Sequence, residues 1–139
     1  MRFAGHVHKA GRYWAVEVPI LGVATQGRSK ADAFAMIADA MESLVNRPGF
    51  SVEVFPGEGA YFEVGSADPA ALTALLLRRE RLKSGLTLAD VAARLGVRSL
   101  NAYARYEQGR AAPTVPKLSQ LLSAVTSSRD FVLDECRAG

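Results

Sequence analysis

The stretch from Thr87 to Gly109 holds the side chains that best suit recognition chemistry. Asn101 can form two hydrogen bonds with the edge of adenine, and Arg105 can form two with guanine. Helical spacing places these two residues and Ala102 on one outward face of a short helix. The residue types and their spacing therefore predict contacts with nucleic-acid bases from Asn101, Ala102 and Arg105.

Residues that flank this face carry hydroxyl and guanidinium groups, which commonly bind phosphate oxygens. Such contacts fix a protein on a duplex without reading its sequence. We expect phosphate contacts from Thr87, Arg98, Ser99 and Arg110. The residues also allow a plain helical bundle, in which the polar helix is simply solvated and its basic side chains serve solubility.

Two short helices joined by a tight turn would position these side chains. Thr87 and Asp90 have the spacing of an N-cap box, and Gly96 can adopt the left-handed conformation that ends a helix. Ala92 is small enough to let a second helix cross close by, and Val97 is expected to plug the junction. This pattern predicts a helix-turn-helix.

The second helix of that motif is predicted to start at Ser99 and to end near Gly109. Tyr103 and Tyr106 are three residues apart, so both rings fall on the same side of this helix. If that side faces the core, the base-reading residues point outward. In this motif the N-terminal half of the second helix enters the major groove.

Further helical patterns lie on both sides of the motif. Asp68 can cap a helix with Pro69 in its first turn, and this helix is expected to end at Gly85. Another helix is predicted from Lys117 to Val125. The tail, residues 127–139, fits either a short strand or a short helix. The apolar stripe expected for the first of these helices consists of Leu72, Leu75, Leu76 and Leu82.

The first half of the chain alternates between apolar and polar residues instead. Hairpins are predicted around residues 9–11 and 56–59, with a third short strand before a helix that Ser29 caps. The expected order is β-β-β-α-β-β, with one helix on one face of a small sheet. The fold class is therefore α+β, with domains at residues 1–66 and 67–139.

The charge is distributed unevenly between these halves. Residues 1–66 hold six Lys and Arg against seven Asp and Glu, whereas residues 67–139 hold eleven against seven. A basic half joined to a near-neutral half is typical of a module that binds a polyanion and is attached to a second module.

Several other residues argue against particular classes of function. His6 and His8 alternate on a strand but lack a third suitable ligand, so we expect no metal and no cofactor. The single cysteine, Cys136, excludes an intramolecular disulfide. Neither a membrane span nor a secretory signal is apparent. We expect a cytoplasmic protein that is not an enzyme.

Residues 72–125 resemble the Xre/Cro class of helix-turn-helix domains. The resemblance implies dimeric binding to palindromic operator DNA, and repression. It implies that Glu107 pairs with Arg81, so that both are structural, as are Ala92, Gly96, Val97, Tyr103 and Tyr106. The matching residues are Leu86-Thr87, Val91-Ala92, Leu95-Gly96-Val97, Arg105-Tyr106-Glu107, Gly109, Pro113 and Leu118.

Two departures from the Xre/Cro pattern affect the contact residues. Leu88 stands where a polar residue that touches DNA is usual. The turn is one residue longer, with Arg98 extra before Ser99, and Leu100 falls where a polar base reader is common. Which residues contact DNA therefore stays open by one position along the sequence.

Residues 3–65 resemble the HicB antitoxin domain. The resemblance implies a degenerate ribonuclease H-like β-β-β-α-β fold without working catalytic carboxylates. It also implies a HicA-like toxin that cleaves messenger RNA as the partner, repression of the protein's own operon, and a homodimer or tetramer. The matching residues are Tyr13-Trp14-Ala15, Glu17-Val18-Pro19, Gly22, Thr25-Gln26-Gly27 and the helix that contains Ala33 and Ala40.

Two other functions stay open at the level of sequence. The chain could be a one-component transcriptional regulator whose first half senses a small ligand or another protein, or a ribonuclease that carries a targeting domain. The ribonuclease would need carboxylates such as Glu17, Asp39 and Glu63 to converge on metal ions. The acids of the first half could instead meet a basic toxin, or could simply be solvated.

Overall fold

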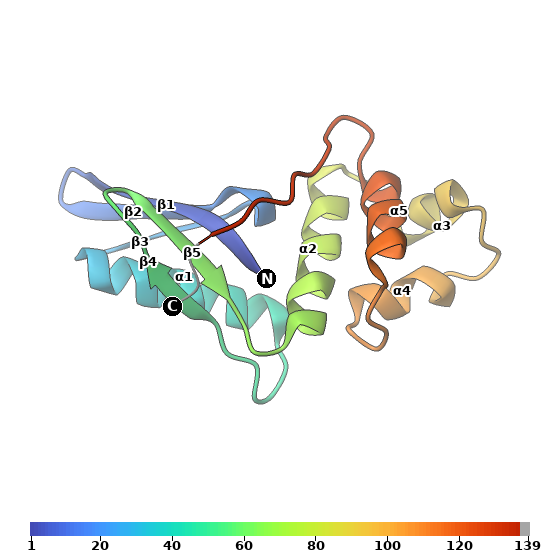
Figure 1. The fold of residues 1–139 in the computed structure, drawn as a ribbon, viewed down its shortest axis with the longest axis horizontal. Coiled ribbons are helices and arrows are strands. Elements are labelled where there is room, and N and C mark those ends of the chain that lie inside the picture. The colour runs from blue at the N-terminus through green and yellow to red at the C-terminus, as the bar shows by residue number, and fades with distance from the viewer. Residues whose placement is uncertain (137–139) are drawn as a thin grey trace.

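Residues 2–65 form a sheet with one helix across one face, and the computed structural model describes residues 1–136 of the chain (Figure 1). The strand order is β3-β2-β1-β5-β4, and each neighbouring pair is antiparallel. The elements of this half are β1 (Arg2–Ala10), β2 (Tyr13–Val18), the 3-10 helix η1 (Pro19–Leu21), β3 (Val23–Gly27), α1 (Lys30–Val45), β4 (Glu53–Pro56) and β5 (Tyr61–Gly65).

The predicted α+β class and the order β-β-β-α-β-β are confirmed. Within residues 1–136 the sheet has five strands, one more than the β-β-β-α-β pattern that the HicB resemblance implies. The hairpin of β4 and β5 supplies the additional strand, with β5 placed beside β1 and β4 at the edge. A ribonuclease H-like fold stays a prediction.

Alternation along the strands gives the sheet two different faces. Phe3, Val7 and Phe62 are buried on the face that α1 covers. The ring of Phe34 on α1 meets the Phe62 ring edge to face, with 5.2 Å between their centroids. The opposite side, which we call the open face, consists of Ala4, His6, His8, Ala15, Glu17, Ala24, Gln26, Tyr61 and Glu63.

The start of α1 lies directly against the end of β3. The hydroxyl of Ser29 accepts a hydrogen bond of 3.0 Å from the backbone nitrogen of Asp32, which caps the helix as predicted. A Cβ atom on Gly27 would lie only 2.3 Å from the backbone nitrogen of Ala33. The absence of a side chain at Gly27 therefore allows this close approach of helix and strand.

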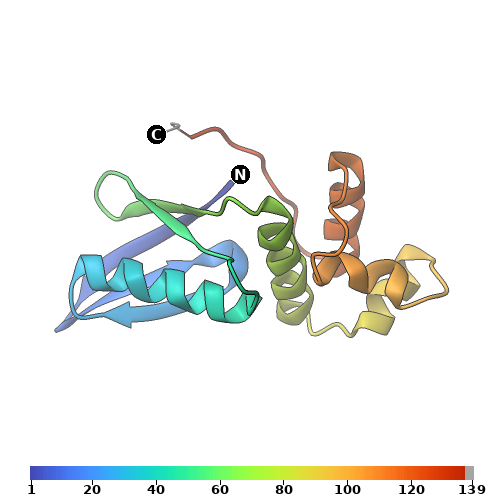
Figure 2. The same cartoon turned by 90° about the horizontal axis from the view of Figure 1, so that it is seen from below.

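The helix α2 (Pro69–Lys83) stands between the sheet and the remaining helices, α3 (Leu88–Leu95), α4 (Asn101–Glu107) and α5 (Val115–Val125) (Figure 2). Every residue from Ala71 to Leu77 is buried, because α2 packs against η1 and α1 on one side and against α4 and α5 on the other. A helix enclosed in this way has no single apolar stripe. The predicted stripe was wrong at Leu82, whose side chain is half-exposed.

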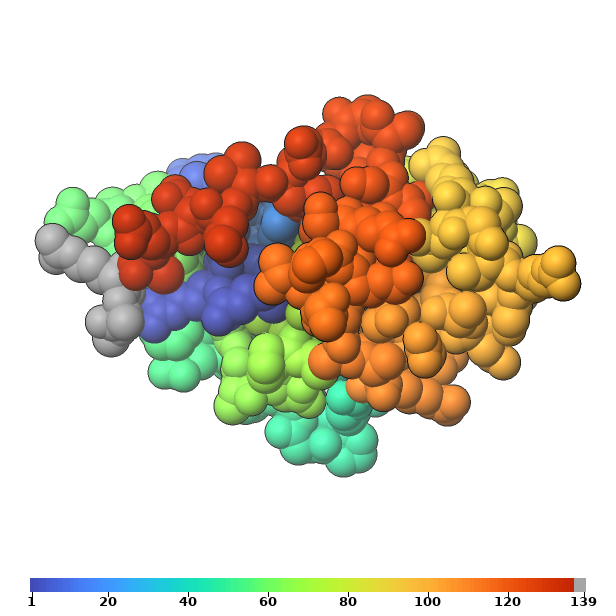
Figure 3. Space-filling view, turned by 45° about the vertical axis from the view of Figure 1, so that its right-hand side comes forward, coloured from blue at the N-terminus to red at the C-terminus, as the bar shows by residue number. Residues whose placement is uncertain are grey.

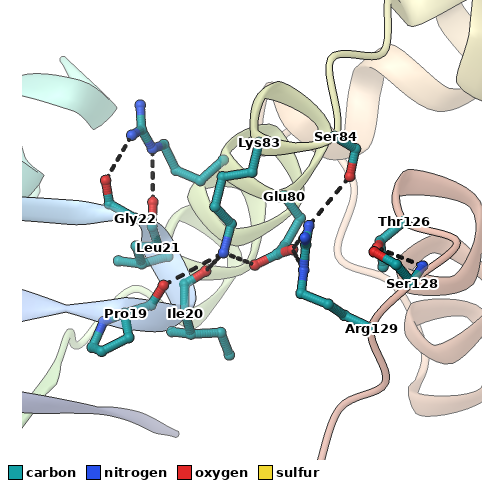
Figure 4. Close-up of polar contacts among 11 residues, drawn as sticks. Pro19, Ile20, Leu21, Gly22, Glu80, Lys83, Ser84, Thr126, Ser128 and Arg129 are labelled. Atoms are coloured by element: carbon teal, nitrogen blue, oxygen red, sulfur yellow. Dashed lines mark hydrogen bonds and ion pairs between the residues drawn. The ribbon is translucent and has the colours of Figure 1, made fainter.

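Basic side chains of α2 fix this helix to the sheet half. Arg79 Nε donates a hydrogen bond of 2.8 Å to the carbonyl oxygen of Leu21, and Lys83 Nζ donates one of 2.9 Å to that of Ile20 (Figure 4). Hydrogen bonds from charged donors are stronger than those between neutral groups. These contacts, together with the buried leucines, define the orientation of α2 relative to the sheet.

Two helices begin at different residues from those predicted. Ser99 does not start the helix: its hydroxyl accepts a hydrogen bond of 3.2 Å from the backbone nitrogen of Asn101, where α4 begins. The last helix begins at Val115 rather than at Lys117. The hydroxyl of Thr114 caps it by accepting a hydrogen bond of 3.2 Å from the backbone nitrogen of Lys117.

The C-terminal segment after α5 forms neither a strand nor a helix up to Cys136, so neither of the two expectations for the tail was right. Arg129 Nη2 lies 2.9 Å from the buried carboxylate of Glu80, which also pairs with Lys83 at 2.6 Å (Figure 4). Beyond Arg129 the segment turns back over the sheet half and lies against β1 (Figure 3). Residues 137–139 of the predicted tail lie outside the described residues.

Candidate nucleic-acid interface

A reciprocal pair of hydrogen bonds sets the start of α3. The backbone nitrogen of Thr87 donates to Asp90 Oδ2 at 2.8 Å, and the backbone nitrogen of Asp90 donates to the Thr87 hydroxyl at 3.1 Å. The hydrogen bonds that Thr87 gives to the Asp90 carboxylate lower the pKa of that group. The capping box satisfies backbone groups that the first turn of a helix leaves unpaired. It fixes Thr87, a predicted phosphate contact, at an exposed helix end.

The turn between α3 and α4 begins with a left-handed glycine. Gly96 has a φ of 70°, and the backbone nitrogen of Val97 donates a hydrogen bond of 3.1 Å to the carbonyl oxygen of Ala92. This is the hydrogen-bond pattern of a Schellman motif, which closes the end of α3. Ala92 is buried where the helices meet, and Val97 is half-buried.

The two sides of α4 differ in the way that the spacing of its residues predicted. Tyr103 and Tyr106 are buried, whereas Asn101 and Arg105 are exposed and Ala102 is half-buried. The structure therefore brings the three predicted base contacts to the outward side of one short helix. These positions agree with the arrangement of a recognition helix.

The guanidinium group of Arg105 lies close to the ring of its neighbour. Its centre is 5.0 Å from the centroid of the Tyr106 ring, and Nη2 is 3.4 Å from the Tyr106 hydroxyl. A cation placed over an aromatic ring is weakly attracted to it. This contact limits the conformations of the Arg105 side chain while leaving it exposed to a ligand.

Arg98, Ser99 and Arg110, the remaining predicted phosphate contacts, are all exposed. Arg98 and Ser99 lie in the turn before α4, and Arg110 lies three residues after its end at Glu107, so they flank the helix at both ends. Within residues 1–136 no carboxylate forms an ion pair with Arg98, Arg105 or Arg110. The surface around α4 thus carries positive charge that the described part of the protein does not neutralise.

A bidentate ion pair anchors α4 to α2. Arg81 Nε lies 2.7 Å from Glu107 Oε2, and Arg81 Nη2 lies 3.0 Å from Glu107 Oε1. The two side chains are 14% and 5% exposed, and the hydrogen bonds with Glu107 raise the pKa of Arg81. Burial, together with the nearby Glu107 carboxylate, raises the pKa of the Tyr103 hydroxyl. The pair implied by the Xre/Cro resemblance is thus formed, and it lies behind the outward side of α4.

The structure gives a reason for the apolar residue at position 88. Leu88 is half-buried and lines a cleft of about 380 Å³ between the two halves of the protein. The other residues of this cleft come mainly from the end of α1, from α2 and from the end of α4. Leu88 therefore packs against the hydrophobic core, which partly shields its side chain from water.

Arg47 is a residue of this region that sequence reasoning missed. Its Nη2 donates a hydrogen bond of 2.8 Å to the carbonyl oxygen of Gln108, and its Nη1 lies 3.4 Å from Asp68 Oδ2. A Cβ atom on Gly109 would lie 2.5 Å from Arg47 Nη2. Arg47 thereby connects the end of α1 with the end of α4, 61 residues later in the chain.

Within residues 1–136 no three histidine, cysteine, aspartate or glutamate side chains come together as a metal site. His6 and His8 are exposed on the open face. Glu17 lies opposite His6 in the strand pairing, on that same face.

The comparisons with known proteins concern the second half of the chain. Residues 74–130 match the family model described as a helix-turn-helix domain. None of the curated proteins matches the chain. No helix within residues 1–136 is both long enough and apolar enough to span a membrane. The match begins inside α2 and includes α3, the turn and α4, so this half of the chain contains a helix-turn-helix domain of the kind that binds DNA.

Proposed function

We propose that the protein is a cytoplasmic antitoxin without enzymatic activity. Its first half binds and neutralises a HicA-like toxin that cleaves messenger RNA. Its second half binds operator DNA as a homodimer and represses the operon that encodes both proteins. The proposal rests on the helix-turn-helix match and on the HicB resemblance of residues 3–65.

One observation carries the DNA-binding part of this proposal. Asn101 and Arg105 are exposed on α4 opposite two buried tyrosines, inside a segment that matches a helix-turn-helix domain. The unpaired arginines around α4 add favourable electrostatics, because phosphate neutralisation supplies much of the affinity for DNA. The operator is expected to be a palindrome, since a two-fold dimer presents two copies of α4.

Arg105→Ala is expected to weaken binding to the operator by about 1–3 kcal/mol and to relax the preference at one base pair. Arg110→Ala should weaken binding to all sequences alike and flatten the dependence of affinity on salt, because it removes a phosphate contact. Titrations with operator and with unrelated duplex at several salt concentrations separate the two effects. Wild-type affinity in both variants would contradict the assignment of α4 as the recognition helix.

The open face supports the proposed role of the first half. The C-terminal segment crosses part of this face (Figure 3), but His6, Glu17 and Tyr61 lie side by side across three strands and each keeps an exposed side chain. The alanines on this face have short side chains, so that a partner could approach the backbone of the strands closely. Of the two acidic residues on this face, Glu63 is paired with Arg2, whereas Glu17 is exposed and would attract a basic protein that binds RNA.

Co-expression with the product of the adjacent gene tests this role. The wild-type protein should relieve the growth arrest that the toxin causes, and the two proteins should co-purify. Glu17→Arg, at the centre of the open face, is expected to reduce rescue strongly and to leave operator binding unchanged. Arg105→Ala serves as the matched control, because it should rescue growth fully while its binding to the operator is impaired. Absence of rescue by the wild type would exclude the antitoxin function.

The alternative is a one-component regulator with a sensing first half, and one observation favours it. The cleft of about 380 Å³ that contains Leu88 also contains Ala104 and Glu107 of α4. Clefts of this volume between domains commonly bind small molecules. This alternative would gain support if the wild-type protein bound operator DNA but failed to rescue growth in the co-expression experiment.

A further inference from the structure

Leu100 is an apolar side chain placed on an otherwise polar surface. It is 49% exposed, and its neighbours Ser99 and Asn101 are exposed as well. Among the described residues from Thr87 to Gly109, it is the single large hydrophobic residue with an exposed side chain. Packing within the described chain therefore does not account for a leucine at this position.

The position of Leu100 brings it to the leading end of α4. Its backbone is already helical, with φ −58° and ψ −35°, and it immediately precedes Asn101. Side chains on a helix lean toward the N-terminus, so the side chain of Leu100 projects past the first turn. In a helix-turn-helix this end of the second helix enters the major groove. On the DNA binding proposed above, Leu100 therefore lies beside Asn101 at the base edges.

The edges of the four base pairs offer an apolar side chain one favourable partner in the major groove. Guanine, cytosine and adenine present hydrogen-bond donors and acceptors there, whereas thymine also presents its C5-methyl group. Leucine placed against a donor or acceptor would remove water from that group without replacing its hydrogen bond, which is unfavourable. We propose that Leu100 selects thymine by contact with the C5-methyl group, beside the base that Asn101 reads.

Replacing thymine by deoxyuridine tests this contact directly, because the exchange removes the methyl group and keeps base pairing. Preferred duplexes are first selected from a random pool with the wild-type protein, and each thymine is then exchanged singly. Wild-type affinity should fall about three- to fivefold at one thymine of each half-site, the factor expected for the burial of one methyl group. Leu100→Ala should bind the thymine and deoxyuridine duplexes equally.

Leu82→Ala is the matched control, since Leu82 is a leucine of almost equal exposure, 50%, at the far end of α2. It should keep the wild-type ratio between the two duplexes. The inference is overturned if Leu100→Ala keeps that ratio too, or if the wild type binds its selected duplex without any effect of deoxyuridine; DNA binding itself would stand in both cases. It is also overturned if Leu100→Ala changes the mass of the free protein in sedimentation, because Leu100 would then belong to a subunit contact. Failure to select any duplex would overturn the proposed DNA binding and this inference together.

Discussion

Arg81→Ala is expected to destabilise the folded protein by about 3–5 kcal/mol, the cost of breaking a buried ion pair by removing one partner. The carboxylate of Glu107, which is 5% exposed, would lose the two hydrogen bonds that now satisfy it. Arg81 also donates a hydrogen bond of 3.0 Å to the carbonyl oxygen of Leu86, which would be lost as well. Chemical denaturation followed by circular dichroism measures the change in the free energy of unfolding.

A second variant separates the ion pair from general packing. The double substitution Arg81→Met with Glu107→Leu should recover most of the lost stability, because an apolar pair leaves no charge uncompensated. Arg105→Ala, which removes an exposed arginine from the same helix pair, should change the free energy of unfolding by less than about 1 kcal/mol. If Arg81→Ala were as stable as Arg105→Ala, the ion pair would have no part in holding α4 on α2.

Gly27→Ala is expected to cost about 3 kcal/mol of stability, at the upper end of the usual range for overpacking. The added methyl group would meet the backbone of Ala33, at 2.3 Å from its nitrogen and 2.7 Å from its Cα. Backbone atoms cannot rotate away as the end of a side chain can, so the first turn of α1 would have to move off β3. The free energy of unfolding and the operator affinity should both be measured, since only the first is expected to change.

Gly11→Ala provides the control for this collision. Gly11 has a φ of +64°, but a Cβ atom there would meet nothing within 4 Å. Its substitution should therefore cost only the strain of a left-handed backbone, about 1–2 kcal/mol. A smaller loss of stability in Gly27→Ala than in Gly11→Ala would show that α1 does not depend on close contact with the strand.

Local signals in the sequence predicted the features of the structure that short-range chemistry decides. The capping pair Thr87 and Asp90 and the left-handed Gly96 depend on residues within one helical turn. The separation of buried tyrosines from exposed Asn101 on α4 follows from helical spacing alone. These features could be read without knowledge of the rest of the chain.

Features that depend on distant parts of the chain could not be predicted in this way. The stripe of α2 failed at Leu82 because leucines on two sides of one helix obscure its periodicity. Arg47 gave no signal, since its partner Gln108 lies in the other half of the chain. The prediction placed the start of α4 at Ser99, but this residue lies before the helix. Its hydroxyl accepts a hydrogen bond from the backbone nitrogen of Asn101, two residues later.

The enclosure of α2 has a consequence for how this architecture can change during evolution. Its leucines belong to two interiors at once, so neither interior is complete in a chain that lacks this helix. Replacement of either half by an unrelated domain would therefore have to keep α2 and to change the residues on one side of this helix. Substitutions are tolerated more easily on the surfaces that this helix does not contact, namely the open face of the sheet and the outward side of α4.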